Sequence, residues 1–170
     1  MTSSAYLTLV ANDPVHRKTA AGLEELIQSQ VMAVRIAGEQ ITGPALERLI
    51  DSVDRACRLP PRPAWEAKTA AQAEIFCLLA EVASGTAAAR EHIHQARLIR
   101  DLMRTVGPAA NGMITSSRRR LLGHLRAGDA DGAALEMENH LRALHYMWRL
   151  ASHPAASAHL RATKRGEGDE

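Results

Sequence analysis

The final helical segment of the chain carries one continuous apolar stripe, and this pattern limits the possible folds most. Beyond residue 133 its members are three or four residues apart: Ala134, Met137, Leu141, Leu144, Trp148 and Ala151. This spacing puts them on one face of an α-helix and does not fit the alternation of a β-strand. Gly128 is placed to end the preceding helix and Asp129 to cap the new one. The stripe therefore predicts a long amphipathic helix from Asp129 to about Ser152.

Five further segments have the same helical period and are separated by proline and glycine. They are expected at about residues 17–40, 43–59, 64–83, 88–105 and 112–127. The second has Thr42 as its cap and Pro44 in its first turn, where the missing N–H costs nothing. The third is apolar nearly all round from Ile75 to Val82, which predicts a central, buried helix. The predicted fold class is all-α, an antiparallel bundle of about six helices.

The bundle is expected to form one domain at residues 17–153. A chain of 170 residues with 46% hydrophobic content is long enough for a single core. Residues 1–16 are expected to be an N-terminal linker that includes a short strand at Tyr6–Val10. Residues 154–170 are expected to be a flexible C-terminal tail.

Composition argues against several classes of function. A net charge of +2 and an aromatic content of 3% give little basis for direct nucleic-acid binding, and Trp65 and Trp148 lie on apolar stripes that favour the core. Two cysteines, Cys57 and Cys77, cannot build a disulfide framework or a four-cysteine zinc site. The sequence has no signal peptide, no apolar run of membrane-spanning length, no nucleophile motif and no phosphate loop. We therefore expect a cytoplasmic, non-enzymatic protein without a membrane partner.

Three segments share an order and spacing with a known family of domains. They read AGEQITGPALERLIDSV at residues 37–53, AEIFCLLAEVASGT at residues 73–86 and GDADGAALEMENHL at residues 128–141. Together they resemble the FCD domain, the helical effector-binding and dimerisation half of FadR-subfamily GntR transcription regulators of bacteria. The resemblance implies a homodimer that binds a small-molecule effector, such as a carboxylate. The winged helix-turn-helix of the family is absent from this chain, so DNA contact is expected only through such a domain, and residues 1–16 would include a remnant of its wing strand.

The same resemblance implies a divalent metal held by one aspartate and three histidines. In this chain the aspartate position falls on Ala73, and the histidine positions fall on Cys77, Arg118 and His140. Alanine cannot coordinate a metal, and Arg118 places a permanent positive charge where the metal would be. We therefore expect no metal and no other cofactor. Glu74 adjoins Ala73 but is rotated by about 100° on the helix, so a site rebuilt from Glu74, Cys77 and His140 is the less favoured alternative.

Arg118 falls in line with leucines on the inner face of its predicted helix. One interpretation makes it an anion anchor, with its guanidinium bound to the carboxylate of an effector in place of the metal. The other interpretation is structural: the stem packs on leucines while the charge reaches solvent or pairs with an acid on a helix. The sequence leaves both open.

His140 and two residues of the third helix complete the predicted ligand site. His140 either contacts the effector, as the resemblance implies, or is a core histidine hydrogen-bonded to Glu136 one turn earlier. Cys77 is expected to pack as a small hydrophobe. By the resemblance, Ala73 and Cys77 line the cavity with Arg118 and His140. The leading hypothesis is thus an effector-sensing and dimerisation domain of a GntR/FadR-type regulator that works without the usual metal; the alternative is a degenerate helical oligomerisation module with no ligand.

Overall fold

The computed structural model describes residues 14–84 and 89–152, and all regular secondary structure in this part of the chain is helical. It contains six α-helices and one 3-10 turn, which confirms the predicted fold class: α2 (Pro14–Gln40), α3 (Gly43–Arg58), α4 (Trp65–Ser84), α5 (Ala89–Val106), η2 (Pro108–Ala110), α6 (Asn111–Arg126) and α7 (Ala130–Ser152). The helix ends lie within three residues of their predicted positions. The strand expected at Tyr6–Val10 and the tail expected from residue 154 lie outside the described residues.

The first turns of α7 and α3 are stabilised by different local interactions. The carboxylate of Asp129 accepts a hydrogen bond from the Gly132 N–H at 2.8 Å, so this side chain caps α7 as predicted. Gly128 precedes it with φ of 70°, a conformation that favours glycine. Thr42 has the extended backbone of an N-cap, but its side chain makes no capping hydrogen bond. The start of α3 therefore rests on Pro44 in its first turn.

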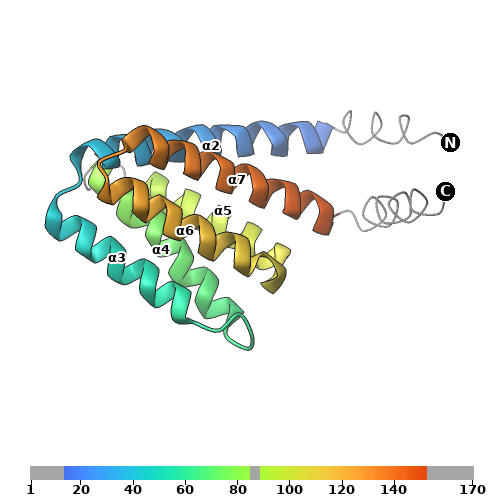
Figure 1. Ribbon diagram of the computed structural model, residues 1–170. Helices are drawn as coiled ribbons and strands as arrows, with labels where there is room; N and C mark the ends of the chain where they lie inside the picture. Colours follow the sequence, from blue (N-terminus) through green and yellow to red (C-terminus); the bar gives the residue numbers. More distant parts are fainter. Residues whose placement is uncertain (1–13, 85–88, 153–170) are drawn as a thin grey trace, which may run out of the picture.

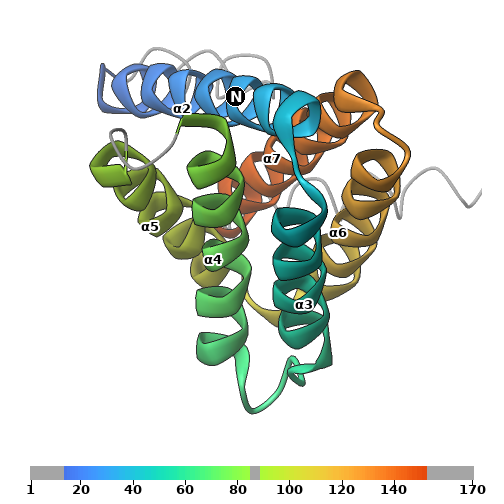
Figure 2. The same cartoon turned by 90° about the vertical axis from the view of Figure 1, so that its left-hand side faces the viewer.

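The helices form a bundle around α4, which packs against α2, α3 and α5 (Figures 1 and 2). Its buried residues include Ile75, Phe76, Leu79 and Ala80, so the prediction of a central third helix is confirmed. α6 packs against α7 and α3. The Arg118 side chain of α6 reaches α4, where it contacts Gln72 and Phe76.

α2 and α7 lie antiparallel along one side of the bundle (Figure 1). Ion pairs cross their solvent-facing seam from Arg35 to Asp131 at 3.3 Å and from Arg142 to Glu24 at 3.0 Å. At one end the helices approach closely, because a Cβ added to Gly38 would lie 2.9 Å from the Ala130 Cα. Glycine at this position therefore permits the backbone contact.

A buried lysine ties α3 to α4. The Lys68 ammonium donates to the carbonyl oxygens of Ala56, Cys57 and Leu59 at 3.0, 3.2 and 2.6 Å. These carbonyls belong to the end of α3, where helix geometry leaves the last carbonyl groups without intrahelical donors. Burial lowers the pKa of Lys68, and the three hydrogen bonds account for its burial as a structural tie.

No helix in the described part of the chain combines the length and apolarity that a membrane span requires.

Candidate anion site

Arg118 is enclosed at the centre of the bundle. Its side chain is 0% exposed although the residue is charged. It projects from the same side of α6 as the buried residues Ile114, Leu121, Leu122 and Leu125. The predicted inward position is confirmed, and the alternative in which the guanidinium reaches solvent is wrong.

Three helices supply groups that contact the guanidinium. Its Nε donates to the Gln72 Oε1 of α4 at 3.1 Å, and its Nη2 lies 3.1 Å from the His140 Nε2 of α7. The Phe76 ring lies below the guanidinium, with 4.6 Å from Cζ to the ring centroid, a cation–π geometry. Arg118 therefore joins α4, α6 and α7 at one point.

The contact with Arg118 fixes the protonation of His140. A guanidinium can only donate, so the His140 Nε2 must accept and carries no proton. The proton of the neutral ring is then on Nδ1. Burial and the charges of Arg118 and Arg120 hold the pKa of His140 well below 6.5, which keeps the ring neutral. Burial also lowers the pKa of Arg118, to about 10, so the guanidinium remains charged at neutral pH.

No carboxylate in the described residues forms an ion pair with Arg118. One of the two interpretations of His140 from the sequence paired it with Glu136 through a hydrogen bond, and the structure contradicts that interpretation. Glu136 instead accepts two hydrogen bonds from Arg120, at 2.8 and 3.0 Å. Two residues along α6 from Arg118, Arg120 reaches the exposed side of the helix and meets Glu136 there. The buried guanidinium is thus left with two neutral acceptors and an aromatic face.

Three donors at this cluster lack a partner in the described part of the chain. They are Arg118 Nη1, His140 Nδ1 and Gln72 Nε2, all buried from solvent. The hydrogen bond from Arg118 assigns the Gln72 oxygen as the accepting atom, so the free atom of this amide is its N–H2 group. A site with one positive charge, spare donors and no acid has the chemistry of an anion site.

The structure brings together only part of the predicted ligand site. Arg118 and His140 meet, but the α4 residues against them are Gln72 and Phe76. Ala73, which is buried, and Cys77, which is half-buried, each follow one of these residues on α4. Burial raises the pKa of the Cys77 thiol, with a smaller contribution from Glu74. Their predicted place in the ligand site stays a prediction.

The sequence analysis missed Gln72, because the resemblance placed the site position on Ala73, the next residue of α4. Its signal was present in the sequence, since Gln72 and Phe76 are four apart and share a helix face. Glu74 points away from the cluster, as predicted: it is half-exposed and pairs with Arg55 of α3 at 2.6 Å.

The residues at this site do not fit the metal that the resemblance implies. The guanidinium of Arg118 occupies the contact position beside His140, and its positive charge opposes a cation there. Within residues 14–84 and 89–152, no three histidine, cysteine, aspartate or glutamate side chains gather as a metal site would require.

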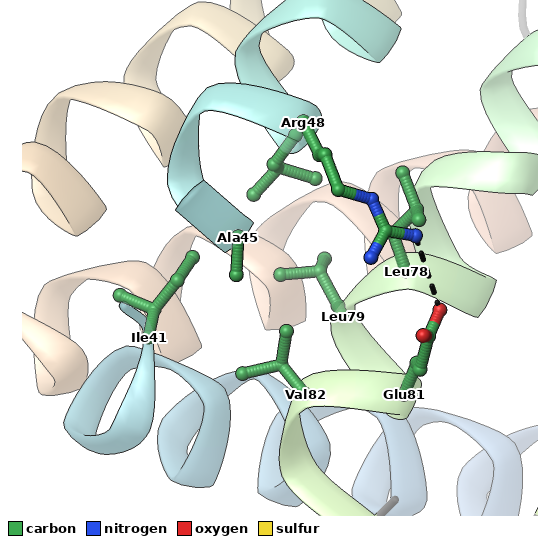
Figure 3. Close-up of a pocket in the computed structure, with 8 residues that line it drawn as sticks. Ile41, Ala45, Arg48, Leu78, Leu79, Glu81 and Val82 are labelled. Carbon is green, nitrogen blue, oxygen red and sulfur yellow. Dashed lines mark ion pairs between the residues drawn. The ribbon is translucent and has the colours of Figure 1, made fainter. Parts of the chain in front are cut away.

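Two cavities of the described structure lie away from Arg118. One, of about 180 Å³, lies between α3 and α4 and is bordered by the ion pair of Arg48 with Glu81 at 3.5 Å (Figure 3). Its remaining walls are mostly aliphatic: Ile41, Ala45, Leu49, Leu78, Leu79 and Val82. The other, of about 330 Å³, lies between α2, α5 and α7, and half-buried Trp148 forms part of its wall. Neither cavity is lined by a residue of the Arg118 cluster.

Comparison of the chain with models of known protein families, with curated proteins and with solved structures finds no match. The described part of the chain is an all-helical domain of six α-helices with a buried arginine cluster at its centre, and it is not assigned to a family.

Proposed function

We propose that this chain is an effector-sensing domain that binds a small carboxylate at Arg118. The observation that carries the proposal is a fully buried guanidinium with a free Nη1 and no carboxylate partner among the described residues. Burying a charge without a counterion is costly, and removing one member of a buried ion pair typically destabilises a protein by about 3–5 kcal/mol. An anionic ligand supplies the missing partner, and the spare N–H groups of His140 and Gln72 add hydrogen bonds to it.

The burial of Arg118 also links ligand binding to helix movement. Because this side chain is 0% exposed, an anion reaches it only when the surrounding helices separate. The ligand therefore favours an arrangement of α4, α6 and α7 other than the closed one. A ligand that changes the balance between two arrangements is what a regulatory domain requires.

The proposed context is an FCD-like domain of a bacterial GntR/FadR-type transcription regulator that acts without the usual metal. The three resembling segments and the six-helix bundle support it, and the replacement of a metal by Arg118 keeps a positive charge at the same place. In this proposal the role is regulatory rather than catalytic, and contact with operator DNA belongs to a separate DNA-binding domain.

Thermal-shift measurements with acetate, succinate, gluconate and inorganic phosphate at matched ionic strength test the carboxylate site. At least one carboxylate is expected to raise the melting temperature of the wild type and of Arg119→Met, which removes an exposed charge next to the site. Arg118→Met is expected to lose this response, and Arg118→Lys to show a weaker one because it lacks the planar fork. Circular dichroism checks that each variant is folded. Equal responses in wild type and Arg118→Met, or no response to any carboxylate in the wild type, would contradict the proposal.

A second candidate function, self-association, is favoured by the outer seam of α2 and α7. Met32 and Leu135 are 56% and 59% exposed. The two ion pairs that cross the seam, from α2 residues 35 and 24 to α7 residues 131 and 142, flank them on either side. Met32 and Leu135 therefore lie at the same level of the antiparallel pair. A second copy related by a two-fold axis along the seam would place Met32 against Leu135 of the partner subunit. The charged residues of the two ion pairs would then face residues of opposite charge on the partner.

Light scattering after size-exclusion chromatography tests this interface. A dimer is expected for the wild type and for Ile93→Glu, which charges an exposed apolar residue on α5. Met32→Glu is expected to give monomers, because two glutamates would face the apolar seam of the partner. A monomeric wild type, or a dimer that persists in Met32→Glu, excludes this surface.

A further inference from the structure

The cavity between α3 and α4 combines aliphatic walls with a pair of opposite charges. Arg48 of α3 and Glu81 of α4 line it together with six aliphatic side chains. Figure 3 shows the charged pair on one side of the cavity and Ile41 and Ala45 on the other. A small molecule held there would therefore meet an apolar surface and both signs of charge.

The volume of the cavity fits one apolar group of medium size. A cavity of about 150 Å³ with aliphatic and aromatic walls can hold benzene, and this one, of about 180 Å³, is slightly larger. Its walls include Leu49 and Leu79, which are buried, and Ile41 and Val82, which are half-buried. The cavity therefore leads from the core toward the surface, and the burial of a branched alkyl group in it is favourable.

A neighbouring ion pair on the same two helices shows what is distinctive about Arg48 and Glu81. Arg55 lies seven residues after Arg48, and Glu74 lies seven residues before Glu81, so both pairs follow one seam of two antiparallel helices. Arg55 and Glu74 are 2.6 Å apart and form a hydrogen bond. Arg48 Nη2 and Glu81 Oε2 are 3.5 Å apart, beyond the usual distance of about 2.7–2.9 Å for a charge-assisted hydrogen bond. The pair beside the cavity is thus the looser of the two.

The loose pair can accept a ligand between its two members. Both side chains are more than half exposed, and an exposed ion pair contributes little to stability, so its separation has a small cost. Arg48 then offers a fork of N–H donors to a carboxylate, and Glu81 offers accepting oxygens to an ammonium group. A carboxylate without an amine would satisfy Arg48 but would be repelled by Glu81. A zwitterion satisfies both side chains and replaces the ion pair that it separates.

We propose that this cavity binds a free amino acid with a branched aliphatic side chain, of the size of leucine. The alkyl group occupies the cavity, the α-carboxylate binds Arg48 and the α-ammonium group binds Glu81. No residue of the Arg118 cluster lines the cavity. The amino-acid site is therefore separate from the proposed carboxylate site and does not depend on it.

Equilibrium dialysis of radiolabelled L-leucine tests the proposal. Saturable binding to the wild type is expected. L-Alanine, whose methyl group leaves most of the cavity empty, is expected to compete about tenfold more weakly or worse. The same loss is expected for isocaproate, which lacks the ammonium group of leucine, and for N-acetyl-leucine amide, which lacks both charges.

Variants of the charged pair test its part in binding. Arg48→Gln and Glu81→Gln are each expected to weaken leucine binding about tenfold or more, and circular dichroism checks that they are folded. The matched control is Arg55→Gln, which removes the other ion pair of the same seam and should leave the leucine affinity unchanged. Arg118→Met separates the two proposed sites, because leucine binding is expected to persist when the buried guanidinium is removed.

Four results would overturn the proposal. One is the absence of saturable leucine binding by the wild type. Another is equal competition by N-acetyl-leucine amide, which would show an apolar pocket that ignores the charges of a free amino acid, as expected for a pocket that takes a leucine side chain of a partner protein. Leucine binding that survives both Arg48→Gln and Glu81→Gln, or that is lost in folded Arg118→Met, would place the ligand elsewhere. The carboxylate site at Arg118 is decided separately, by the thermal-shift response to carboxylates.

Discussion

The Nη2 of Arg118 lies 3.1 Å from the Nε2 of His140, and this contact holds a permanent cation against a ring that must remain neutral. Both side chains are buried. Protonation of His140 would place two positive charges in contact and would replace the accepting nitrogen by a donor. The charge state of His140 and the packing of α6 against α7 are therefore coupled.

The first prediction concerns pH. Burial, Arg118 and Arg120 depress the pKa of His140 in the folded state well below the value of 6.5 expected in the unfolded chain. Below pH 6.5 the unfolded chain binds a proton that the native state does not, so stability is present above this pH and is lost as the pH falls toward the native pKa. The loss approaches about 1.4 kcal/mol per pH unit.

Guanidinium unfolding at pH 7.5, 6.0 and 5.0 measures this slope. His140→Gln is expected to reduce it, because the replacement cannot titrate. Burial also lowers the pKa of His145, so this residue contributes to the pH dependence of stability with the same sign. His145→Gln measures that contribution separately. An unchanged slope in His140→Gln would contradict the predicted coupling.

The second prediction concerns Lys68. Lys68→Met keeps the length of the side chain but leaves the carbonyls of Ala56, Cys57 and Leu59 without their shared donor. A buried group that loses its partner costs about 1–3 kcal/mol, and a net loss of about 2–3 kcal/mol in the free energy of unfolding is expected. The control is Arg58→Met, at an exposed position in the last turn of α3. It should change the free energy of unfolding by no more than about 0.5 kcal/mol. Chemical denaturation compares the two.

Two glycines of α2 give the third prediction, with opposite signs. A Cβ at Gly38 would lie 2.9 Å from the Ala130 Cα, whereas a Cβ at Gly22 would have no neighbour within 4 Å. Gly22→Ala should stabilise by up to about 1 kcal/mol through helix propensity. Gly38→Ala should destabilise by about 1–2 kcal/mol, since overpacking outweighs the same gain. Thermal unfolding of the pair decides the matter, and equal shifts would mean that α2 and α7 are not in tight contact.

The fourth prediction concerns the cap of α7. Asp129 accepts from the Gly132 N–H and pairs with His124 at 2.8 Å, and these hydrogen bonds lower its pKa, the Gly132 bond most. Asp129→Ala should cost about 1 kcal/mol, the usual value of a cap. Asp129→Asn keeps an accepting oxygen for Gly132 and should recover most of that loss. If alanine and asparagine behave alike in urea unfolding, the hydrogen bond to Gly132 contributes little.

The sequence predicted the helices well because their boundaries depend on local chemistry. Pro44 and Asp129 act on their own helices, and apolar periodicity reports the buried face of each helix without reference to its neighbours. The inward position of Arg118 followed from the same argument, since only its own helix was needed to place it.

The partners of Arg118 could not be predicted in this way. Gln72 and His140 lie 46 and 22 residues from Arg118 in the sequence, on other helices. The rotation of those helices about their axes decides which of their residues face Arg118. The resemblance placed Ala73 and Cys77 at the site, whereas the α4 residues that contact Arg118 are Gln72 and Phe76, each one residue earlier in the chain. For the same reason Glu136 was offered as one possible partner of His140 by proximity on one helix, whereas Arg120 binds Glu136 through two hydrogen bonds.

The contact of Gly38 with Ala130 fixes the spacing of α2 and α7 at one end of the pair. The backbones of α2 and α7 meet there with almost no side chain between them, so the helices resist sliding and tilting at that end more than elsewhere. At the far end of the pair, α2 begins at Pro14 and α7 ends at Ser152 (Figure 1). A rotation of the two helices about the Gly38 contact would therefore displace Pro14 and Ser152 more than the residues near Gly38.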